Sequence, residues 1–414
     1  MATMLKPEVE AAVNPLDVSR AELYTEHKWH EPFRTLRETA PVYWCAESKF
    51  GAYWSVSSYK AIQHVEALPD IYSSDWEAGG ITIADRLDNA ADIQLPMFIA
   101  MDRPKHTDQR RTVAPAFTPS EMVRMSEDIR RRTGELLDTL PYGEKFDWVD
   151  KVSIELTTGM LALLFDFPWE DRRKLTFWSD WAGDIELAND PARLEERLGH
   201  LFEMGAYFKR LWDERVDKEP TPDLISMMIH SEAMKDMGEM EFMGNLVLLI
   251  VGGNDTTRNT MSGIAYSLDK FPDQRALLEN DPSIIATAAS EFIRWQTPLA
   301  HMRRTATQDT ELEGQKIKKG DKVIMWYISG NRDESVFPEA DKLILKRENA
   351  RRHLAFGYGI HRCVGARLAE MQVAILLEEM AKRRMRVNVV GEPVRVAQSF
   401  VNGYKSMQVE LSRY

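Results

Sequence analysis

Apolar side chains recur at helical spacing through most of the middle of the chain. Four such segments span Met122–Leu140, Ile154–Leu164, Leu194–Val216 and Met240–Leu268. The last segment predicts a helix of about 30 residues, roughly 45 Å long, which is enough to run through the centre of a domain. We expect it to end near Pro272 because proline cannot continue a helix.

Strand patterns occur towards the two ends of the chain. Two short alternating runs, Val42–Trp44 and Ala52–Val56, predict a hairpin. Later strand patterns span Thr310–Leu312, Lys322–Ile328 and the alternating residues Met407, Val409 and Leu411. Because no segment resembles a linker, we predict one mainly α-helical domain over residues 1–414, with small β-sheets in its N-terminal and C-terminal parts.

Composition narrows the class of protein. The 414 residues carry a net charge of −12, which argues against a nucleic-acid partner, because the phosphate backbone requires a basic face. The two cysteines cannot build a disulfide scaffold. The N-terminus lacks the apolar core of a signal peptide, and the longest apolar run, Leu246–Val251, is too short to span a bilayer. We therefore expect a soluble, cytoplasmic protein without a membrane anchor.

The segment Phe356-Gly-Tyr-Gly-Ile-His-Arg-Cys-Val-Gly365 carries the strongest chemical signal. Its glycines permit close backbone approach, and Cys363 is expected to open a helix whose N-terminus would stabilise a thiolate. Zinc would require further ligands nearby, and a hydrolytic nucleophile would require a positioned base. A buried, inert cysteine is the structural alternative. The glycine spacing favours a single protein ligand to an open metal, and heme iron is the natural candidate.

The long predicted helix contains a locally unfavourable segment, Gly252–Thr257. Each glycine inside a helix costs roughly 1 kcal/mol relative to alanine, so a flat ligand lying against the backbone would explain their presence. Thr256 can bond back to a carbonyl of the preceding turn and open a local bulge, and Asp255 beside it suggests a proton relay. The alternative is a Gly-Gly helix contact with a surface aspartate.

The cysteine segment resembles the heme-binding loop of cytochrome P-450 enzymes, whose pattern is Phe-x-x-Gly-x-x-x-Cys-x-Gly. The resemblance covers nearly the whole chain. It implies the P-450 fold, with the long central helix over heme b (iron protoporphyrin IX) and Cys363 as the axial thiolate ligand of the iron. It also implies that Asp255 and Thr256 deliver protons during the activation of dioxygen, whereas a peroxide-driven or isomerising heme-thiolate enzyme often lacks this pair.

The same resemblance implies further roles. Glu291, Arg294 and Phe356 would be structural, with the Glu-x-x-Arg pair helping to hold the cysteine loop. Partners for the heme propionates would be His106, Arg110, Arg304 and His361. A solvated surface position is the alternative for each of these four, and Arg303 could take the place of Arg304.

Within the superfamily, the Gly252–Asn259 and Ile293–Arg304 segments are similar to soluble bacterial P-450 enzymes that hydroxylate terminal carbons of medium-chain alkanes and fatty acids. This implies a monooxygenase that uses O2 and a small hydrophobic substrate. A terpenoid or alicyclic hydroxylase and a non-catalytic heme-thiolate sensor or carrier are the alternatives. The expected substrate pocket consists of Leu299, Leu248, Val251, Ile81 and Ile83.

Electrons must come from a partner, because the chain has no Gly-x-Gly-x-x-Gly fingerprint. The resemblance implies a ferredoxin and its NAD(P)H-dependent reductase. Four arginines around the cysteine loop could steer an acidic ferredoxin, although they could instead pair with internal acids: Arg351, Arg352, Arg362 and Arg367.

Overall fold

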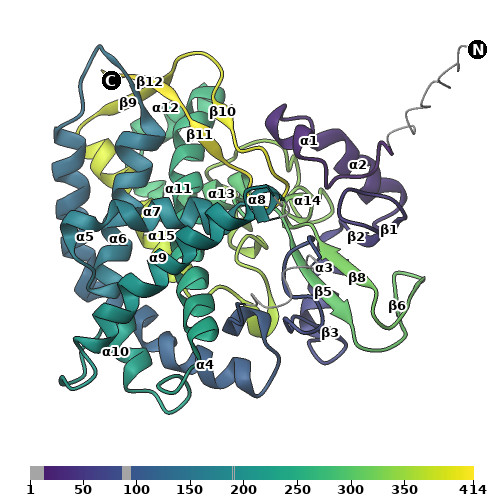
Figure 1. Cartoon of the computed structure of the whole chain (residues 1–414). Coiled ribbons are helices and arrows are strands. Elements are labelled where there is room, and N and C mark those ends of the chain that lie inside the picture. Colours follow the sequence, from purple (N-terminus) through teal and green to yellow (C-terminus); the bar gives the residue numbers. More distant parts are fainter. Residues whose placement is uncertain (1–13, 86–94, 189, 191) are drawn as a thin grey trace, which may run out of the picture.

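The computed structural model describes residues 14–85, 95–188, 190 and 192–414. A large helical part and a smaller sheet-containing part lie side by side (Figure 1). The helices are α1 Ala21–Thr25, α2 His30–Thr39, α3 Tyr59–Ala67, α4 Lys105–Val113, α5 Pro119–Asp138, α6 Glu155–Phe165, α7 Arg173–Gly183, α8 Ile185–Ala188, α9 Leu194–Asp213, α10 Leu224–Ile229, α11 Glu239–Lys270, α12 Pro272–Asn280, α13 Ile285–Gln296, α14 Tyr327–Gly330 and α15 Ala366–Lys382. The predicted class, mainly α-helical with small sheets, is confirmed.

Single helical turns connect several of these elements. They lie at Phe98–Ala100, Ala114–Phe117, Val149–Ile154, Trp169–Asp171, Pro282–Ile284, Ala350–Arg352 and Gly359–His361. The last of these turns lies within the cysteine loop.

The four predicted helices all form, as α5, α6, α9 and α11, with ends that differ from the prediction by a few residues. The helix α11 continues without interruption through Gly252 and Gly253, so the expected local bulge is absent. It ends at Lys270, directly before Phe271 and Pro272, as predicted. Packing against α6, α7, α9 and α13 compensates for the weak intrinsic helix propensity of its glycines.

The principal sheet has the strand order β1-β2-β8-β5-β3. Its strands are β1 Val42–Cys45, β2 Tyr53–Val56, β3 Tyr72–Ser73, β5 Met302–Ala306 and β8 Lys322–Met325. The predicted hairpin is confirmed, because Val42 pairs with Val56 and Trp44 with Trp54 in antiparallel register. The strand predicted over Lys322–Ile328 ends at Met325, and Ile328 lies in α14 instead.

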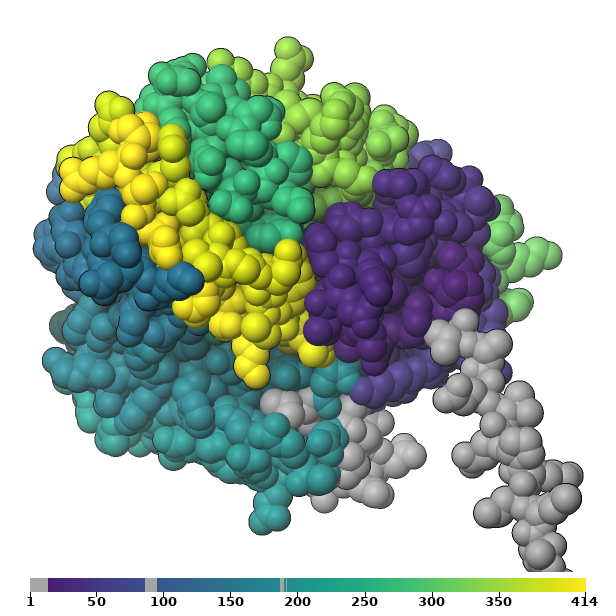
Figure 2. All heavy atoms as spheres, turned by 90° about the horizontal axis from the view of Figure 1, so that it is seen from above, coloured from purple at the N-terminus to yellow at the C-terminus, as the bar shows by residue number. Residues whose placement is uncertain are grey.

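Smaller sheets lie outside the principal one. They consist of β4 Lys145–Asp147, β12 Gln408–Arg413 and β9 Met385–Val389 in one sheet, β6 Thr310–Leu312 with β7 Gln315–Ile317, and β10 Val394–Arg395 with β11 Tyr404–Ser406. The C-terminal strands, yellow in Figure 2, lie against the purple N-terminal region, where β10 contacts α1. This contact joins an N-terminal helix to a strand of the C-terminal region.

No helix in the described ranges is long and apolar enough to cross a membrane. That residues 1–414 form a single domain stays a prediction.

Candidate active site

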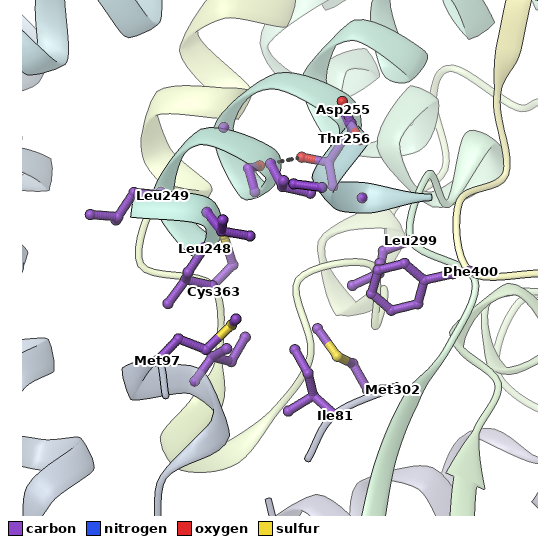
Figure 3. Close-up of a pocket in the computed structure, with 18 of the residues that line it drawn as sticks. Ile81, Met97, Leu248, Leu249, Asp255, Thr256, Leu299, Met302, Cys363 and Phe400 are labelled. Carbon is purple, nitrogen blue, oxygen red and sulfur yellow. Dashed lines mark hydrogen bonds between the residues drawn. The ribbon is translucent and has the colours of Figure 1, made fainter. Parts of the chain in front are cut away.

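A cavity of about 780 Å3 lies between α11 and the cysteine loop. Its wall is built from segments far apart in the chain, including the loop before α4, the start of α9, the turn after α13 and the start of β5. Figure 3 shows Thr256 of α11 and Cys363 of the loop on the border of this space. The cavity therefore joins the two sequence motifs that carry the candidate chemistry.

The cysteine loop is held in place by its backbone. Gly359 has a φ of +67°, and a Cβ at this position would lie 2.3 Å from the carbonyl oxygen of Glu66 on α3. Only glycine tolerates both the dihedral angle and the close contact. The N–H of Cys363 donates to the carbonyl of Phe356 at 2.8 Å. The helix α15 begins three residues later, at Ala366, so Cys363 precedes the helix rather than opening it.

The Cys363 side chain is accessible from the cavity. Burial within the protein raises the pKa of its thiol, although a bond from the Gly365 N–H and the charges of Arg110 and Arg362 act in the opposite direction. A metal ion bound at the sulfur would release this proton. Within the described residues no group of three or more His, Cys, Asp and Glu could hold a metal ion. A metal centre at the sulfur would therefore not be held by three or more such side chains from the described residues.

The face of α11 that borders the cavity has no bulky side chain at Gly252, where a Cβ would meet nothing within 4 Å. Thr256 lies one turn further, and its hydroxyl donates to the carbonyl of Gly252 at 2.8 Å (Figure 3). Gly253 instead faces α6, where its Cβ would lie 2.8 Å from Leu161. The two glycines therefore serve different purposes: Gly252 leaves space for a ligand and Gly253 allows helix packing.

The carboxylate of Asp255 is directed away from the open centre of the cavity, towards α7 (Figure 3). Its Oδ1 accepts hydrogen bonds from Ser179 at 2.8 Å, from Asn254 at 3.0 Å and from Arg258 at 3.1 Å. Arg258 also donates to Asp180 at 2.8 Å, and Asp180 is half exposed. Burial raises the pKa of Asp255 even though Arg258 opposes the shift. Asp255 is thus neither a surface residue nor bonded to Thr256.

The four predicted propionate partners all lie on the cavity wall. His106 and Arg110 share one face of α4, and the rings of His106 and His361 stand 4.2 Å apart. Both ring nitrogens of His106 and Nδ1 of His361 are buried without a hydrogen-bond partner. Burial and nearby arginines lower the pKa of His106 to about 4 and that of His361 to about 2.

Arg304 rather than Arg303 reaches the cavity, because successive strand residues point to opposite faces. Arg303 instead forms an ion pair with Asp85 at 2.7 Å.

Glu66 of α3 lies on the same wall, and sequence reasoning missed it. Its Oε1 accepts from the Tyr327 hydroxyl at 2.6 Å and lies 3.6 Å from Arg304, whereas its buried Oε2 has no partner. Burial raises the pKa of Glu66 to about 7, opposed by Arg304 and Tyr327. No local motif marks this glutamate, because its partners come from β5 and α14.

Glu291 and Arg294 lie outside the cavity wall and are completely buried in α13. Their side chains form two bonds of 2.7 and 2.8 Å, and Arg294 also donates to the carbonyls of Asn331 and Ala340. Arg347, which sequence reasoning missed, donates to both oxygens of Glu291 at 3.1 Å. Such a buried network ties α13 to the segment that leads into the cysteine loop.

Most of the expected substrate pocket lies on the wall: Ile81, Leu248, Val251 and Leu299. Three further apolar residues share the wall, namely Met97, Met302 and Phe400. Figure 3 shows Ile81, Leu299, Met302 and Phe400 along one side of the open space, and Met97 with Leu248 on the other.

Ile83, also expected in the pocket, does not line the cavity. It is fully buried in the hydrophobic core beside the principal sheet. Its N–H donates to His301 at 3.4 Å and its carbonyl accepts from Lys322 at 3.0 Å. These backbone bonds fix the segment with Ile83 facing the core, so its assignment to the pocket was wrong.

The residues on the wall fit a heme. Gly252 offers open space beside the helix, and Cys363 supplies a thiol on the opposite side of the cavity. Two arginines and the unpartnered nitrogens of His106 and His361 provide donors for two carboxylates. A cavity with one thiol and two arginines suits a heme bound through a thiolate.

A cytochrome P450 family model matches residues 283–389. The chain is 37% identical to linalool 8-monooxygenase of Pseudomonas putida over 95% of this chain and 98% of that protein. This chain belongs to the cytochrome P450 family. It is a monooxygenase, and its cofactor is heme b.

Two further comparisons refine the position within the family. The methyl-branched lipid omega-hydroxylase of Mycobacterium tuberculosis is 32% identical, with 92% of this chain and 90% of that protein covered. The structure of cytochrome P450-153 from Novosphingobium aromaticivorans superimposes with a TM-score of 0.93 at 63% identity, covering 96% of this chain and all of that one.

Proposed function

We propose that this enzyme hydroxylates the terminal carbon of medium-chain alkanes or fatty acids. A ferredoxin, itself reduced by an NAD(P)H-dependent reductase, would supply the two electrons that each turnover needs. The overall reaction combines R–H, O2, two electrons and two protons into R–OH and water.

The observation that supports this proposal is the apolar wall of the cavity opposite Leu248. A terminal methyl has a stronger C–H bond than the neighbouring methylene, so chemistry alone favours attack one carbon in from the end. Terminal attack therefore requires a wall that admits only the end of the chain. Leu299, Met302 and Phe400 come from two separate segments and converge on the space that borders Cys363 and Thr256. We infer that these three side chains exclude the penultimate carbon.

In this proposal Cys363 binds the iron as a thiolate, and His106, Arg110, Arg304 and His361 hold the propionates. When bound, heme b supplies the activation of dioxygen and the oxidation of the C–H bond. The residues of the chain orient the cofactor, keep bulk water out of an apolar cavity and supply protons from one side.

Thr256 and Asp255 have distinct parts in proton supply. Thr256 places its hydroxyl at the cavity border and can pass on its proton while Oγ1 remains near the Gly252 carbonyl. Asp255 holds a proton more readily than an exposed aspartate, because burial raises its pKa. Its bonds to Ser179 and Arg258 connect it with the half-exposed Asp180. We infer that protons reach Thr256 from this side of α11.

A terpenoid hydroxylase is the second candidate, because a relative carries the name linalool 8-monooxygenase. Both candidates predict an apolar cavity, so they differ in substrate preference rather than in chemistry.

Product analysis separates the two candidates. The heme-loaded enzyme, supplied with a ferredoxin and its reductase, would be given octane, dodecanoic acid and linalool in parallel. We expect 1-octanol and 12-hydroxydodecanoic acid as the principal products, and slower turnover of linalool. Absence of terminal products from both octane and dodecanoic acid would refute the proposal, and a strong preference for linalool would favour the second candidate.

A further inference from the structure

Arg197 on α9 is a charged residue of the cavity wall. It has no part in the proposed binding of heme or in the proposed proton path. Two further acidic residues lie on the wall outside the cluster of propionate partners, namely Asp85 and Asp255. Asp85 pairs with Lys322 at 2.6 Å, and Asp255 pairs with Arg258. Arg197, by contrast, has no carboxylate within ion-pair distance in the described part of the chain.

The guanidinium of Arg197 is fixed by the end of α7. Its Nε donates to the carbonyl of Trp181 at 3.1 Å, and its Nη2 donates to that of Ala182 at 3.2 Å. Among the described residues, Nη1 has no protein partner. Burial lowers the pKa of Arg197 and Asp184 partly opposes this shift, but an arginine keeps its proton in proteins.

A partly buried guanidinium that is fixed in place and keeps one N–H group free of the described residues beside an apolar cavity is well placed to bind an anion. Carboxylates are well suited to this task, because charge-assisted bonds to a guanidinium are short and strong. The neighbouring wall residues Leu194, Leu198 and Leu201 lie on the same helix and would contact an alkyl chain attached to that carboxylate.

We propose that Arg197 binds the carboxylate of a fatty-acid substrate, so that the enzyme prefers fatty acids to alkanes of the same length. This inference rests on the proposed hydroxylation of unbranched chains. The acid is anchored at the start of α9, while its alkyl chain extends along the apolar wall towards Cys363.

The test compares ligands that differ only in charge. Dodecanoic acid and its methyl ester would be titrated into the ferric, heme-loaded enzyme while the substrate-induced change of the heme spectrum is followed. We expect Arg197→Gln to weaken binding of the acid by about ten-fold or more, because a bond to a charged group is lost. Binding of the ester should remain unchanged. Glutamine can still donate to the α7 carbonyls, so this variant removes the charge while keeping a donor for the helix contact.

Arg193→Gln is the matched control, because Arg193 is exposed on the surface just before α9 and pairs with Glu196 at 3.3 Å. We expect this variant to bind the acid like the parent enzyme. Arg197→Lys should retain part of the preference for the acid. If the Gln variant does not fold, the parent enzyme decides the question: the acid should bind more tightly than the ester.

Equal binding of acid and ester by the parent, or equal binding of the acid by the parent and Arg197→Gln, would overturn the role of Arg197. Product analysis distinguishes this failure from that of the proposed function. Octane hydroxylated at its end without a preference for acids would refute Arg197 alone. Tight acid binding through Arg197 with attack away from the chain end would refute terminal hydroxylation alone.

Discussion

Single side chains at the cavity border are held by short local bonds. Cys363 follows the two left-handed glycines Gly357 and Gly359, and Thr256 bonds back to the turn that contains Gly252. Neither side chain forms a hydrogen bond to a distant segment within the described residues. Substituting either residue should therefore change the chemistry while leaving the fold intact.

We expect Cys363→His to abolish the red-shifted Soret band that thiolate-bound heme shows when reduced and exposed to carbon monoxide. Cys45→Ser is the control. Cys45 lies buried in the β-rich core, where burial raises the pKa of its thiol to about 11, so its loss should not alter the spectrum. Persistence of the band in Cys363→His would contradict the ligand assignment.

For Thr256→Ala we expect normal substrate binding but diversion of electrons to hydrogen peroxide. Positioned proton donors contribute roughly a hundred-fold or more to rates, so the amount of product per NAD(P)H consumed should fall strongly. Thr158→Ala is a matched control, because the Thr158 hydroxyl donates in the same way to the carbonyl of Ile154, one turn earlier, but Thr158 lies off the cavity wall. Unchanged coupling in Thr256→Ala would exclude this hydroxyl from proton transfer.

At the scale of elements, the contact between α3 and the cysteine loop combines close packing with a buried acid. Gly359 packs against the backbone of Glu66, whose carboxyl group lies beside Arg304. The loop therefore packs directly against the residue whose carboxyl group lies beside Arg304.

The pKa of Glu66 rises from 4.5 to about 7 on folding, so the folded state keeps a proton that the unfolded chain releases. Its stabilising contribution is present below pH 4.5 and is lost as the pH rises through 7. The loss amounts to about 3 kcal/mol at most. We expect the urea midpoint of the parent to fall between pH 5 and pH 8 more than that of Glu66→Gln. Glu334→Gln, at an exposed site, should follow the parent. Parallel profiles for the parent and Glu66→Gln would contradict this prediction.

Long amphipathic helices could be predicted from the sequence, whereas local details of helices and loops could not. Periodicity located α5, α9 and α11 because their apolar faces repeat over many turns. The predicted bond from Thr256 to the preceding turn forms, but the bulge expected from it is absent, because the helix accommodates the bond without a break. Ile81 and Ile83 were both assigned to the pocket from the same loop, but backbone bonds to His301 and Lys322 fix Ile83 towards the core.

Residues in contiguous motifs could be predicted to lie at the cavity, whereas isolated ones could not. Cys363 and His361 belong to one loop, and His106 and Arg110 share one helical turn of sequence. Glu66, Arg197 and Phe400 reach the wall only through tertiary contacts between distant segments. No local pattern distinguishes such residues from ordinary surface or core positions.

At the scale of the whole molecule, charge is distributed unevenly. The net charge is −12, yet four exposed arginines surround the cysteine loop. They are Arg351, Arg352, Arg362 and Arg367. A local basic cluster on an acidic protein attracts acidic partners to that site and repels them elsewhere.

We therefore expect the rate of heme reduction by an acidic ferredoxin to fall with added salt. At low salt, Arg362→Glu should slow reduction, because it reverses one charge within the cluster. Lys316→Glu makes the same change on the exposed β6–β7 hairpin and should have little effect. Salt-independent reduction, or an unaffected Arg362→Glu enzyme, would indicate that these arginines do not steer the partner.

The position of the hydroxyl group in the product tests most directly whether the cavity wall selects the chain end. Leu299 borders the open space beside Phe400 and Met302 (Figure 3). Leu299→Ala should retain heme but shift the product of octane from 1-octanol towards 2-octanol. A change of about 1.4 kcal/mol in relative barriers would alter the ratio ten-fold. A terminal-to-subterminal ratio that falls in Leu299→Ala is the predicted result, and an unchanged ratio would contradict the steric role of Leu299.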